Sequence, residues 1–255
     1  MRLLILTPIL CQWAAAACSP IPGAGPLWSR SSLRFVIVGE MHGSAETPAI
    51  FADLVCAAKA SGRTVIVGIE HSPAEQETID TFLHARDRDE ARKNLLSLKG
   101  WQGTDGRASR AMYGLLEDLR DMQVEVVAFD AGAGLGNADR NRAMADALEA
   151  AAQRHAGALI VALTGNIHGS KKLFGGYAPM AMLLPAAETV SLLAIDRGGQ
   201  IWASIDGVDG PHDLRSSGGD ERGLDLTPAR ARMGGYDGVL STGLPSTASP
   251  PVSAR

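Results

Sequence analysis

Histidines and carboxylates follow apolar segments at three places along the chain. Glu40 and His42 lie in the run Gly-Glu-Met-His-Gly, Glu70 follows a second apolar segment, and His168 lies in Gly-Asn-Ile-His-Gly. We call these four residues the strand-end set. Two residues apart in an extended segment, Glu40 and His42 point to the same side. Carboxylates and imidazoles gathered in this way can transfer protons during hydrolysis, or they can bind a divalent metal ion.

Each member of the strand-end set comes at the carboxyl end of a predicted strand. The predicted strands are short apolar runs, namely Leu33–Gly39, Thr64–Ile69, Val124–Phe129 and Ala158–Leu163. Such runs are typical of strands that are buried on both faces of a parallel sheet. Ligands of open parallel sheets bind outside the carboxyl ends of the strands. We therefore expect the four residues to meet at one edge of one sheet.

Amphipathic helices are predicted between the strands. Helical patterns cover Pro48–Ala60, the segment that begins at Ser72-Pro73-Ala74-Glu75, the stripe from Met112 to Met122, and the segment from Asn137. Ser, Pro and Glu at these spacings are typical of a helix start. The alternation of strand and helix predicts an α/β fold, a single domain with a mainly parallel sheet flanked by helices.

The pattern changes after the fourth predicted strand. Thr189–Ile195 and Gln200–Ile205 are strand-like and are joined by a Gly-rich turn, which predicts an antiparallel hairpin. Asp206–Gly235 is rich in Gly, Asp and Arg and is expected to form a long surface excursion. The α/β domain is predicted to span 33–242, and the Pro- and Ser-rich segment 243–255 is predicted to be a disordered tail.

Other polar residues near the strand ends have different expected roles. Arg140 shares a helical stripe with Met144, so it should face the core and bind a carboxylate or a substrate oxyanion. His71 must point away from Glu70 and is expected to pack or to support the site. Asp130 follows a strand and is expected to be a helix cap or turn former. The remaining histidines are expected on the surface without a role, namely His84, His155 and His212.

Composition and missing motifs exclude several classes of protein. The chain has 255 residues with 24 Lys and Arg and 28 Asp and Glu, a net charge of −4, so no nucleic-acid partner is expected. Asn137 occupies the third glycine position of a dinucleotide fingerprint that Gly132 and Gly134 begin. The chain has neither a Walker A loop nor a Gly-x-Ser-x-Gly elbow, which disfavours nucleotide-dependent enzymes and serine hydrolases.

Residues 1–17 have the pattern of a secretory signal peptide. A basic start and a short apolar run end in Ala14-Ala15-Ala16-Ala17. Cys18 follows directly and resembles the lipid-attachment cysteine of bacterial lipoproteins, although Ala15 stands where Leu is usual. We expect an exported protein, either periplasmic or anchored to the outer membrane through Cys18. Residues 18–32, rich in Pro and Gly, are predicted to form a flexible tether.

The cysteine count leaves one cysteine in the predicted domain. Cys11 lies in the signal peptide, and Cys18 is removed, lipidated or part of the tether. No disulfide can then form within the domain without Cys18. Cys56 is expected to be a small, inert core residue.

The motifs at the strand ends resemble those of a known superfamily. Val38–Glu46 is similar to the opening Gly-Glu-x-His-Gly motif of the erythromycin esterase / ChaN / Tiki superfamily. Gly68-Ile69-Glu70 resembles its second strand. Arg140-x-x-x-Met144-Ala145 and the run Leu163–His168 resemble its third and fourth motifs, in the same order. The resemblance covers about residues 33–172.

The resemblance implies divided functions. Erythromycin-esterase-like members are hydrolases, Tiki-like members are metal-dependent proteases, and ChaN-like members are lipoproteins that bind haem. We expect an exported hydrolase of a small molecule or a peptide, with or without a divalent metal ion. His42 would be the general base or a metal ligand, while Glu40 and Glu70 would be ligands or orienting groups. Arg140 would clamp an oxyanion or carboxylate, and His168 would complete the site.

The alternative is a lipoprotein that binds haem or an iron complex without catalysis. The same crevice would then provide a His or Tyr axial ligand and an apolar wall. Tyr177, in the loop after His168, and Met41 are the candidates for contacts with that cofactor. The only contact with a membrane would be the lipid anchor at Cys18.

Overall fold

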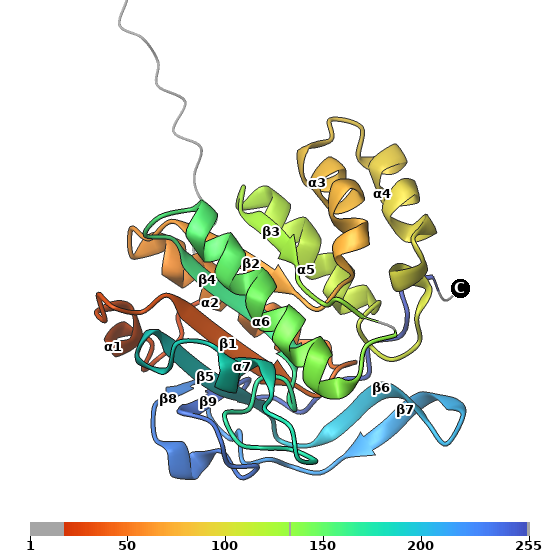
Figure 1. The fold of residues 1–255 in the computed structure, drawn as a ribbon. Coiled ribbons are helices and arrows are strands. Elements are labelled where there is room, and N and C mark those ends of the chain that lie inside the picture. Colours follow the sequence, from red (N-terminus) through yellow and green to blue (C-terminus); the bar gives the residue numbers. More distant parts are fainter. Residues whose placement is uncertain (1–17, 133, 254–255) are drawn as a thin grey trace, which may run out of the picture.

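Seven strands form one sheet in the computed structural model, which describes residues 18–132 and 134–253. The strands are β1 (Phe35–Glu40), β2 (Val65–Ile69), β3 (Glu125–Ala128), β4 (Leu159–Gly165), β5 (Thr189–Ile195), β8 (Gly223–Asp225) and β9 (Gly238–Ser241). Their order is β3-β2-β4-β1-β5-β9-β8, and β8 alone among these strands runs antiparallel to its neighbour (Figure 1). The predicted signal peptide, 1–17, lies outside the described residues.

Helices cover both faces of the sheet (Figure 1). One face carries α2 (Glu46–Ala60), α3 (Gln76–His84) and α5 (Arg110–Asp121), and α4 (Arg88–Ser97) packs on α3. The other face carries α6 (Asn137–Arg154) and the short α7 (Met180–Leu183). The remaining short helices are α1 (Gly25–Trp28), η1 (Pro73–Glu75), η2 (Lys99–Gln102), η3 (Ala186–Glu188) and η4 (Pro228–Arg230).

The two cores follow from the alternation of side chains along the strands. In β1, Val36 and Val38 pack against the α2 face, while Phe35 and Ile37 pack against the α6 face. Burying each such side chain contributes about 1.5–3 kcal/mol. The predicted α/β domain with a mainly parallel sheet flanked by helices is confirmed.

The antiparallel hairpin exists, but its strands differ from the prediction. β5 lies inside the main sheet between β1 and β9, and β6 (Gly199–Ile205) pairs with β7 (Val208–Leu214) instead. Asp206 and Gly207 connect the hairpin strands, with φ angles of 53° and 78°. Positive φ at both central residues is the requirement of the two-residue turn that suits hairpins. The predicted surface excursion therefore contains a strand of the hairpin.

The predicted tether is packed against the domain. Leu27 of α1 is fully buried, and the N–H of Leu224 donates to the carbonyl of Pro22 at 2.8 Å. A β-carbon at Gly23 would lie 2.0 Å from the carbonyl oxygen of Leu224, so only glycine permits this approach. The flexible-tether prediction is thus corrected, because the glycine allows close packing here.

The predicted tail is also packed, as far as residue 253. The N–H of Ser249 donates to Gly43 at 2.8 Å, and the N–H of Val252 donates to Ala108 at 2.9 Å. Ser246 and Ser249 are buried. The disordered-tail prediction is corrected for the described residues, because main-chain hydrogen bonds hold this segment without an apolar pattern.

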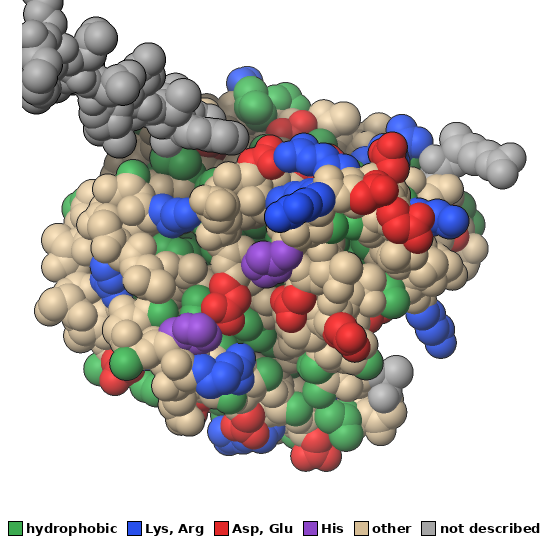
Figure 2. All heavy atoms as spheres, turned by 90° about the horizontal axis from the view of Figure 1, so that it is seen from above, with side chains coloured by type: hydrophobic (Ala, Val, Ile, Leu, Met, Phe, Trp, Pro, Cys, Tyr) green, Lys and Arg blue, Asp and Glu red, His purple; other side chains and the backbone are tan. Residues whose placement is uncertain are grey.

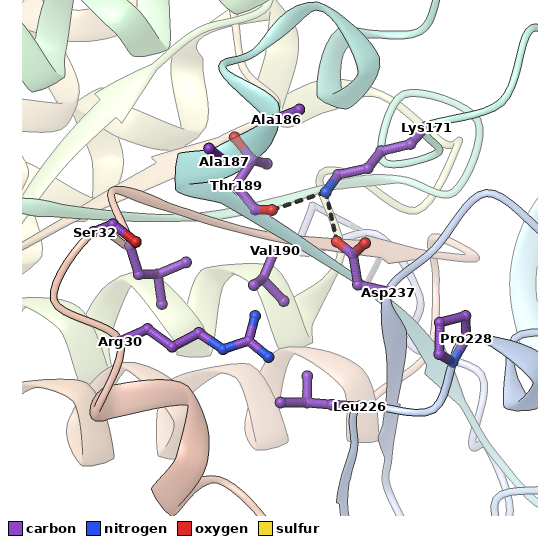
Figure 3. A pocket seen from close by; sticks show the side chains of 11 residues that line it. Arg30, Ser32, Lys171, Ala186, Ala187, Thr189, Val190, Leu226, Pro228 and Asp237 are labelled. Atoms are coloured by element: carbon purple, nitrogen blue, oxygen red, sulfur yellow. Dashed lines mark hydrogen bonds and ion pairs between the residues drawn. The ribbon is translucent and has the colours of Figure 1, made fainter.

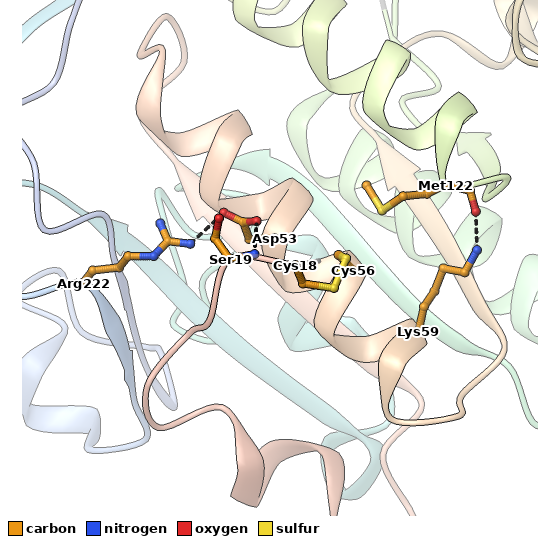
Figure 4. The surroundings of a disulfide bond; sticks show 7 residues. All are labelled: Cys18, Ser19, Asp53, Cys56, Lys59, Met122 and Arg222. Atoms are coloured by element: carbon orange, nitrogen blue, oxygen red, sulfur yellow. Dashed lines mark hydrogen bonds and ion pairs between the residues drawn. A yellow bond between two sulfur atoms is a disulfide. The ribbon is translucent and has the colours of Figure 1, made fainter. Parts of the chain in front are cut away.

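A disulfide joins Cys18 to Cys56 of α2 (Figure 4). Beside it, Asp53 accepts the N–H of Ser19 at 3.1 Å and a guanidinium N–H of Arg222 at 2.7 Å. Cys56 is therefore a half-buried disulfide partner, which corrects the prediction of an inert core residue. A sulfur in a disulfide cannot carry a lipid thioether as well, so this structure is incompatible with lipidation of Cys18.

The surface gives no sign of a membrane span. Within the described residues, no helix combines the length and hydropathy that crossing a bilayer requires. Acidic and basic side chains are intermixed on the face that Figure 2 shows.

Candidate functional site

The strand-end set meets at the carboxyl edge of the sheet, as predicted. The reason is the strand order, since β3, β2, β4 and β1 are consecutive neighbours. Glu40 at the end of β1 is level with Gly165 at the end of β4. Glu70 directly follows β2, and His168 follows β4 within a short turn. Segments that are up to 128 positions apart in sequence, Glu40 to His168, thereby share one site.

His42 lies between two carboxylates. Its Nδ1 is 3.0 Å from Oε1 of Glu40, and its Nε2 is 3.6 Å from Oε2 of Glu70. Burial alone would lower the pKa of His42, but the hydrogen bonds and charges of the two carboxylates outweigh it and raise that pKa to about 10. His42 is therefore an imidazolium at neutral pH.

Glu40 has one oxygen without a partner. Burial raises the pKa of Glu40, although the hydrogen bond and charge of His42 oppose this. Within the described part of the chain, its Oε2 is buried and has no hydrogen-bond partner. A buried acceptor of this kind is costly to leave unpaired, so it is a place where a ligand or a water molecule can donate.

Glu70 is held by three donors. Its Oε2 accepts hydrogen bonds from the hydroxyl of Thr164 at 2.7 Å and from the N–H of Gly165 at 2.6 Å. Its Oε1 accepts a hydrogen bond from Nη2 of Arg140 at 3.0 Å. Burial would raise the pKa of Glu70, but the hydrogen bond to His42, nearby positive charge and the Gly165 N–H hold it well below its usual value. Glu70 is thus a fixed carboxylate.

His168 has a different hydrogen-bond partner from His42. Its Nδ1 is 2.7 Å from Oδ1 of Asn141, and that oxygen also accepts the N–H of Met180 at 2.8 Å. The Nδ2 of Asn141 donates to the carbonyl of Asn137 at 2.8 Å, which settles the orientation of the amide. His168 must therefore carry a hydrogen on Nδ1, so that Nε2 has the lone pair when the ring is neutral. Burial lowers the pKa of His168, which favours this neutral form.

The free Nε2 of His168 faces the site, 3.9 Å from Oε1 of Glu70. Asn141 was not predicted as part of the site, although its position on the helix offered a signal. It lies on the apolar stripe of α6 with Met144, Ala145 and Leu148, and it is fully buried. A polar residue on such a stripe needs a specific partner.

Two arginines flank the fixed carboxylate. Arg140 binds Asp130 with Nε and Nη2, both at 2.7 Å, in addition to Glu70, so its predicted carboxylate partners are present. Arg107, which was not predicted, places Nη1 3.1 Å from Oδ2 of Asp130 and 3.6 Å from Glu70. It comes from a loop without periodicity, so no local signal marks it.

Asp130 forms ion pairs in addition to the turn that the sequence predicts. It accepts the N–H of Gly132 at 2.9 Å, which is the predicted turn. It also forms ion pairs with Arg107 and Arg140. The sequence-based prediction, a turn former only, did not include these ion pairs. These charges hold its pKa below the usual value, although burial opposes them.

Gly165 lies against both imidazoles and Glu70. A β-carbon at this position would lie 3.1 Å from Nε2 of His42 and 3.7 Å from Cδ2 of His168. Both imidazoles therefore border the volume that the missing side chain leaves.

The other predicted residues lie outside this cluster. His71 stacks on Trp101 at 4.5 Å and places Nδ1 3.1 Å from Glu75, so it packs as expected. Met41 is 47% exposed, and its sulfur accepts Nδ2 of Asn166 at 3.0 Å. Tyr177 packs edge-to-face on Phe174, and in the described residues no hydrogen bond or ion pair joins it to the strand-end set.

The donor set does not fit a divalent metal ion. In the described residues, no group of three or more His, Cys, Asp or Glu side chains has an arrangement that could hold one. Both oxygens of Glu70 already accept hydrogen bonds. The guanidinium groups of Arg107 and Arg140 add positive charge beside the carboxylates that a cation would need.

A pocket of about 300 Å³ lies away from this site, at the amino ends of β1 and β5 (Figure 3). Lys171 donates there to the carbonyl of Thr189 at 2.8 Å and to Asp237 at 2.6 Å, so its charge is neutralised. No member of the strand-end set lines this pocket.

Comparisons with known proteins identify the fold. No family profile and no curated protein sequence matches the chain. A solved succinoglycan biosynthesis protein is 11% identical with a TM-score of 0.66, covering 91% of this chain and 93% of its own. A Bacillus cereus protein is 11% identical with a TM-score of 0.58, covering 89% and 92%. The erythromycin esterase EreC, as a variant in its open conformation, is 12% identical with a TM-score of 0.59, covering 88% and 90%. The chain therefore has the fold of an erythromycin esterase.

Proposed function

We propose that the protein is a hydrolase that cleaves an ester by direct attack of water, with His168 as general base and His42 as general acid. The observation that carries this proposal is that the two imidazoles have different partners, two carboxylates for His42 and an amide oxygen for His168. His42 sits between Glu40 and Glu70, while His168 donates Nδ1–H to Asn141 and keeps Nε2 free. Environments that separate the pKa values of paired groups are typical of acid–base catalysis.

The proposed reaction uses one water molecule. Nε2 of His168 takes a proton from water, and the water oxygen bonds to the carbonyl carbon of the ester. As the carbon–oxygen bond to the leaving alcohol breaks, His42 gives its proton to that oxygen. The proton on His168 then passes to solvent and His42 regains one, so the net reaction consumes one water. The imidazolium and the nearby guanidinium groups favour the negative charge that develops on the carbonyl oxygen.

Glu70 has a supporting role in this proposal. Its carboxylate lies between both imidazoles, and Arg140, Thr164 and Gly165 fix its position. A fixed charge there keeps His42 protonated without becoming protonated itself. Supporting groups of this kind commonly tune catalytic residues that they do not replace.

The proposal derives no step through a metal ion, because the donor set does not fit one. Binding of haem or an iron complex has no comparable support. The sulfur of Met41 is already a hydrogen-bond acceptor, and Tyr177 packs against Phe174. Export remains part of the proposal, and the Cys18–Cys56 disulfide supports it because such bonds persist in oxidising compartments. Anchorage through Cys18 has no such support.

Ester hydrolysis by the purified protein tests the proposal. Nitrophenyl esters of increasing acyl length serve as substrates, for the unaltered protein and for His168→Asn and His42→Asn. We expect hydrolysis above the uncatalysed rate, and a loss of about 100-fold or more in kcat/KM for His168→Asn. His84→Asn, on the exposed end of α3, is the matched control and should retain full activity. No hydrolysis by the unaltered protein, or full activity of His168→Asn, would refute the proposal.

A further inference from the structure

A pocket of about 180 Å³ is lined by two residues that lie next to the strand-end site in the chain, Met41 and Asn166. Met41 lies between Glu40 and His42 in the chain, and Asn166 directly follows Gly165. The two side chains line the pocket and contact each other, with Nδ2 of Asn166 3.0 Å from the sulfur of Met41. The pocket therefore begins one residue along the chain from His42 and from Gly165, on the side of β5, although no member of the strand-end set lines it.

The lining of this pocket is apolar in part. Met41, Leu193, Leu214 and Met233 contribute apolar side chains. Met233 is 42% exposed, and unbranched methionine side chains adapt to differently shaped ligands. The volume equals roughly six water molecules at about 30 Å³ each, which suits a short acyl chain.

Two arginines line the pocket without a partner among the described residues. Arg215 and Arg232 line it, and in the described residues neither guanidinium has a hydrogen bond or an ion pair. By contrast, Arg107 and Arg140 in the neighbouring site bind carboxylates. The guanidinium of Arg232 lies beside the turn at Gly218, at the rim of the pocket.

One carboxylate lines the pocket without neutralising these arginines. Asp196 accepts the N–H of Gly198 at 2.7 Å, and in the described residues it forms no ion pair with Arg215 or Arg232. Burial raises the pKa of Asp196, although the hydrogen bond from Gly198 opposes this. Two guanidinium groups against one carboxylate leave the pocket positively charged.

We propose that this pocket, which we call the Arg215–Arg232 pocket, binds an oxyanion at the far end of the acyl chain of the substrate. The inference rests on the proposed ester hydrolysis and names its substrate class, an ester of a short apolar acid that ends in a carboxylate or phosphate-like group. Guanidinium groups bind both anions through paired hydrogen bonds. The apolar side chains would contact the methylene groups between the anion and the ester.

Paired substrates test the charge preference directly. The nitrophenyl monoester of glutaric acid carries a terminal carboxylate, and the nitrophenyl ester of pentanoic acid has the same chain without the charge. We expect kcat/KM to favour the anionic ester by about tenfold or more, since hydrogen bonds to charged groups contribute on that scale. A third ester of equal length that ends in a phosphonate distinguishes a carboxylate-selective pocket from a phosphate-selective one.

Substitution of the arginines shows whether the pocket is responsible. Arg215→Gln and Arg232→Gln should each reduce the preference by roughly threefold to tenfold, because both side chains are exposed, and the double variant should abolish it. Activity on the neutral ester should stay the same. Arg230→Gln is the matched control, because Arg230 lies in the same segment but faces Asp225 at 3.6 Å. A preference that survives in the double variant overturns the inference.

A binding measurement separates this inference from the proposed chemistry. The monoanilide of glutaric acid and the anilide of pentanoic acid are titrated into the His168→Asn variant by calorimetry. Tighter binding of the anionic anilide, lost in the Arg215→Gln/Arg232→Gln background, supports the pocket even if no ester is hydrolysed. Equal binding of the two anilides, or binding of neither, overturns the inference even if esters are hydrolysed.

Discussion

Nδ1 of His168 lies 2.7 Å from Oδ1 of Asn141, an oxygen that also accepts the main-chain N–H of Met180. The Asn141 amide is oriented by its second hydrogen bond, to Asn137. This single contact determines which nitrogen of His168 is free to accept a proton. Asn141 is thus a positioning residue that touches no substrate in the proposed reaction.

Asn141→Asp should shift the pH dependence of hydrolysis. A carboxylate at this distance from His168 favours its protonated form and raises its pKa, by about 1–3 units. In the pH profile of kcat/KM, the rise on the acid side should therefore move to higher pH. The value of kcat/KM at the plateau of that profile should change less. Asn94→Asp on the exposed face of α4 is the control and should leave the limb in place. An unchanged acid limb in Asn141→Asp would show that the contact does not control His168.

The unaltered enzyme should show a bell-shaped pH profile. Burial lowers the pKa of His168 below its ordinary 6.5, so activity should rise as pH increases through that lowered value. The pKa of His42 is raised to about 10, so activity should fall as pH increases through about 10 and the imidazolium loses its proton. Initial rates corrected for spontaneous hydrolysis give both limbs. His42→Gln should remove the alkaline limb, and its persistence would assign that limb to another group.

Gly165→Ala should reduce activity without unfolding the protein. The new β-carbon would lie 3.1 Å from Nε2 of His42 and occupy the space between the two imidazoles. We expect a loss of about tenfold or more in kcat/KM, as small displacements of reacting groups can cause. The melting temperature should change little. Gly114→Ala in α5, where a β-carbon meets nothing within 4 Å, should keep full activity. Equal activity of both variants would place the reaction elsewhere.

The Cys18–Cys56 disulfide should stabilise the protein by about 4 kcal/mol. It links residues 38 positions apart and so restricts the unfolded chain. Denaturant unfolding of Cys56→Ser should show this loss, and a reductant should lower the unaltered protein to the same stability. The reductant should have no effect on Cys56→Ser, which serves as the control. A reductant-insensitive unaltered protein would mean that the bond is absent in solution.

Chelation of divalent metal ions should leave ester hydrolysis unchanged. The site carries two arginines next to its carboxylates, and both oxygens of Glu70 already accept hydrogen bonds. Dialysis against EDTA, with metal content measured on the same sample, provides the check. Loss of activity that zinc or another divalent ion restores would contradict the donor-set argument.

The first four strands, β1 to β4, could be predicted because a strand buried on both faces is almost entirely apolar. Each of β1 to β4 overlaps its predicted run. The predicted hairpin paired β5 with β6, whereas β6 pairs with β7. The apolar run of β5 and the amphipathic run of β6 do not indicate which strand each of them pairs with. The Asp206-Gly207 turn was the better signal for the hairpin.

The chain ends show a second limit of sequence patterns. Segments 18–32 and 243–253 are held by main-chain hydrogen bonds and a disulfide, and neither has helical or strand periodicity. Their Gly, Pro and Ser content resembles that of flexible linkers. The same small residues also allow close approach of backbones, as at Gly23. Composition alone does not separate these two cases.

The sequence by itself determined the apolar strands and the polar residues that follow them, because burial and chain direction are local properties. It therefore placed Glu40, His42, Glu70 and His168 at one edge. Only the tertiary structure decided how each of them is charged. Arg107, Asp130 and Asn141 come from other segments, and long-range strand pairing brings them within hydrogen-bond distance of the site. A pKa depends on neighbours in space, so the different roles of the two histidines appear only once the chain is folded.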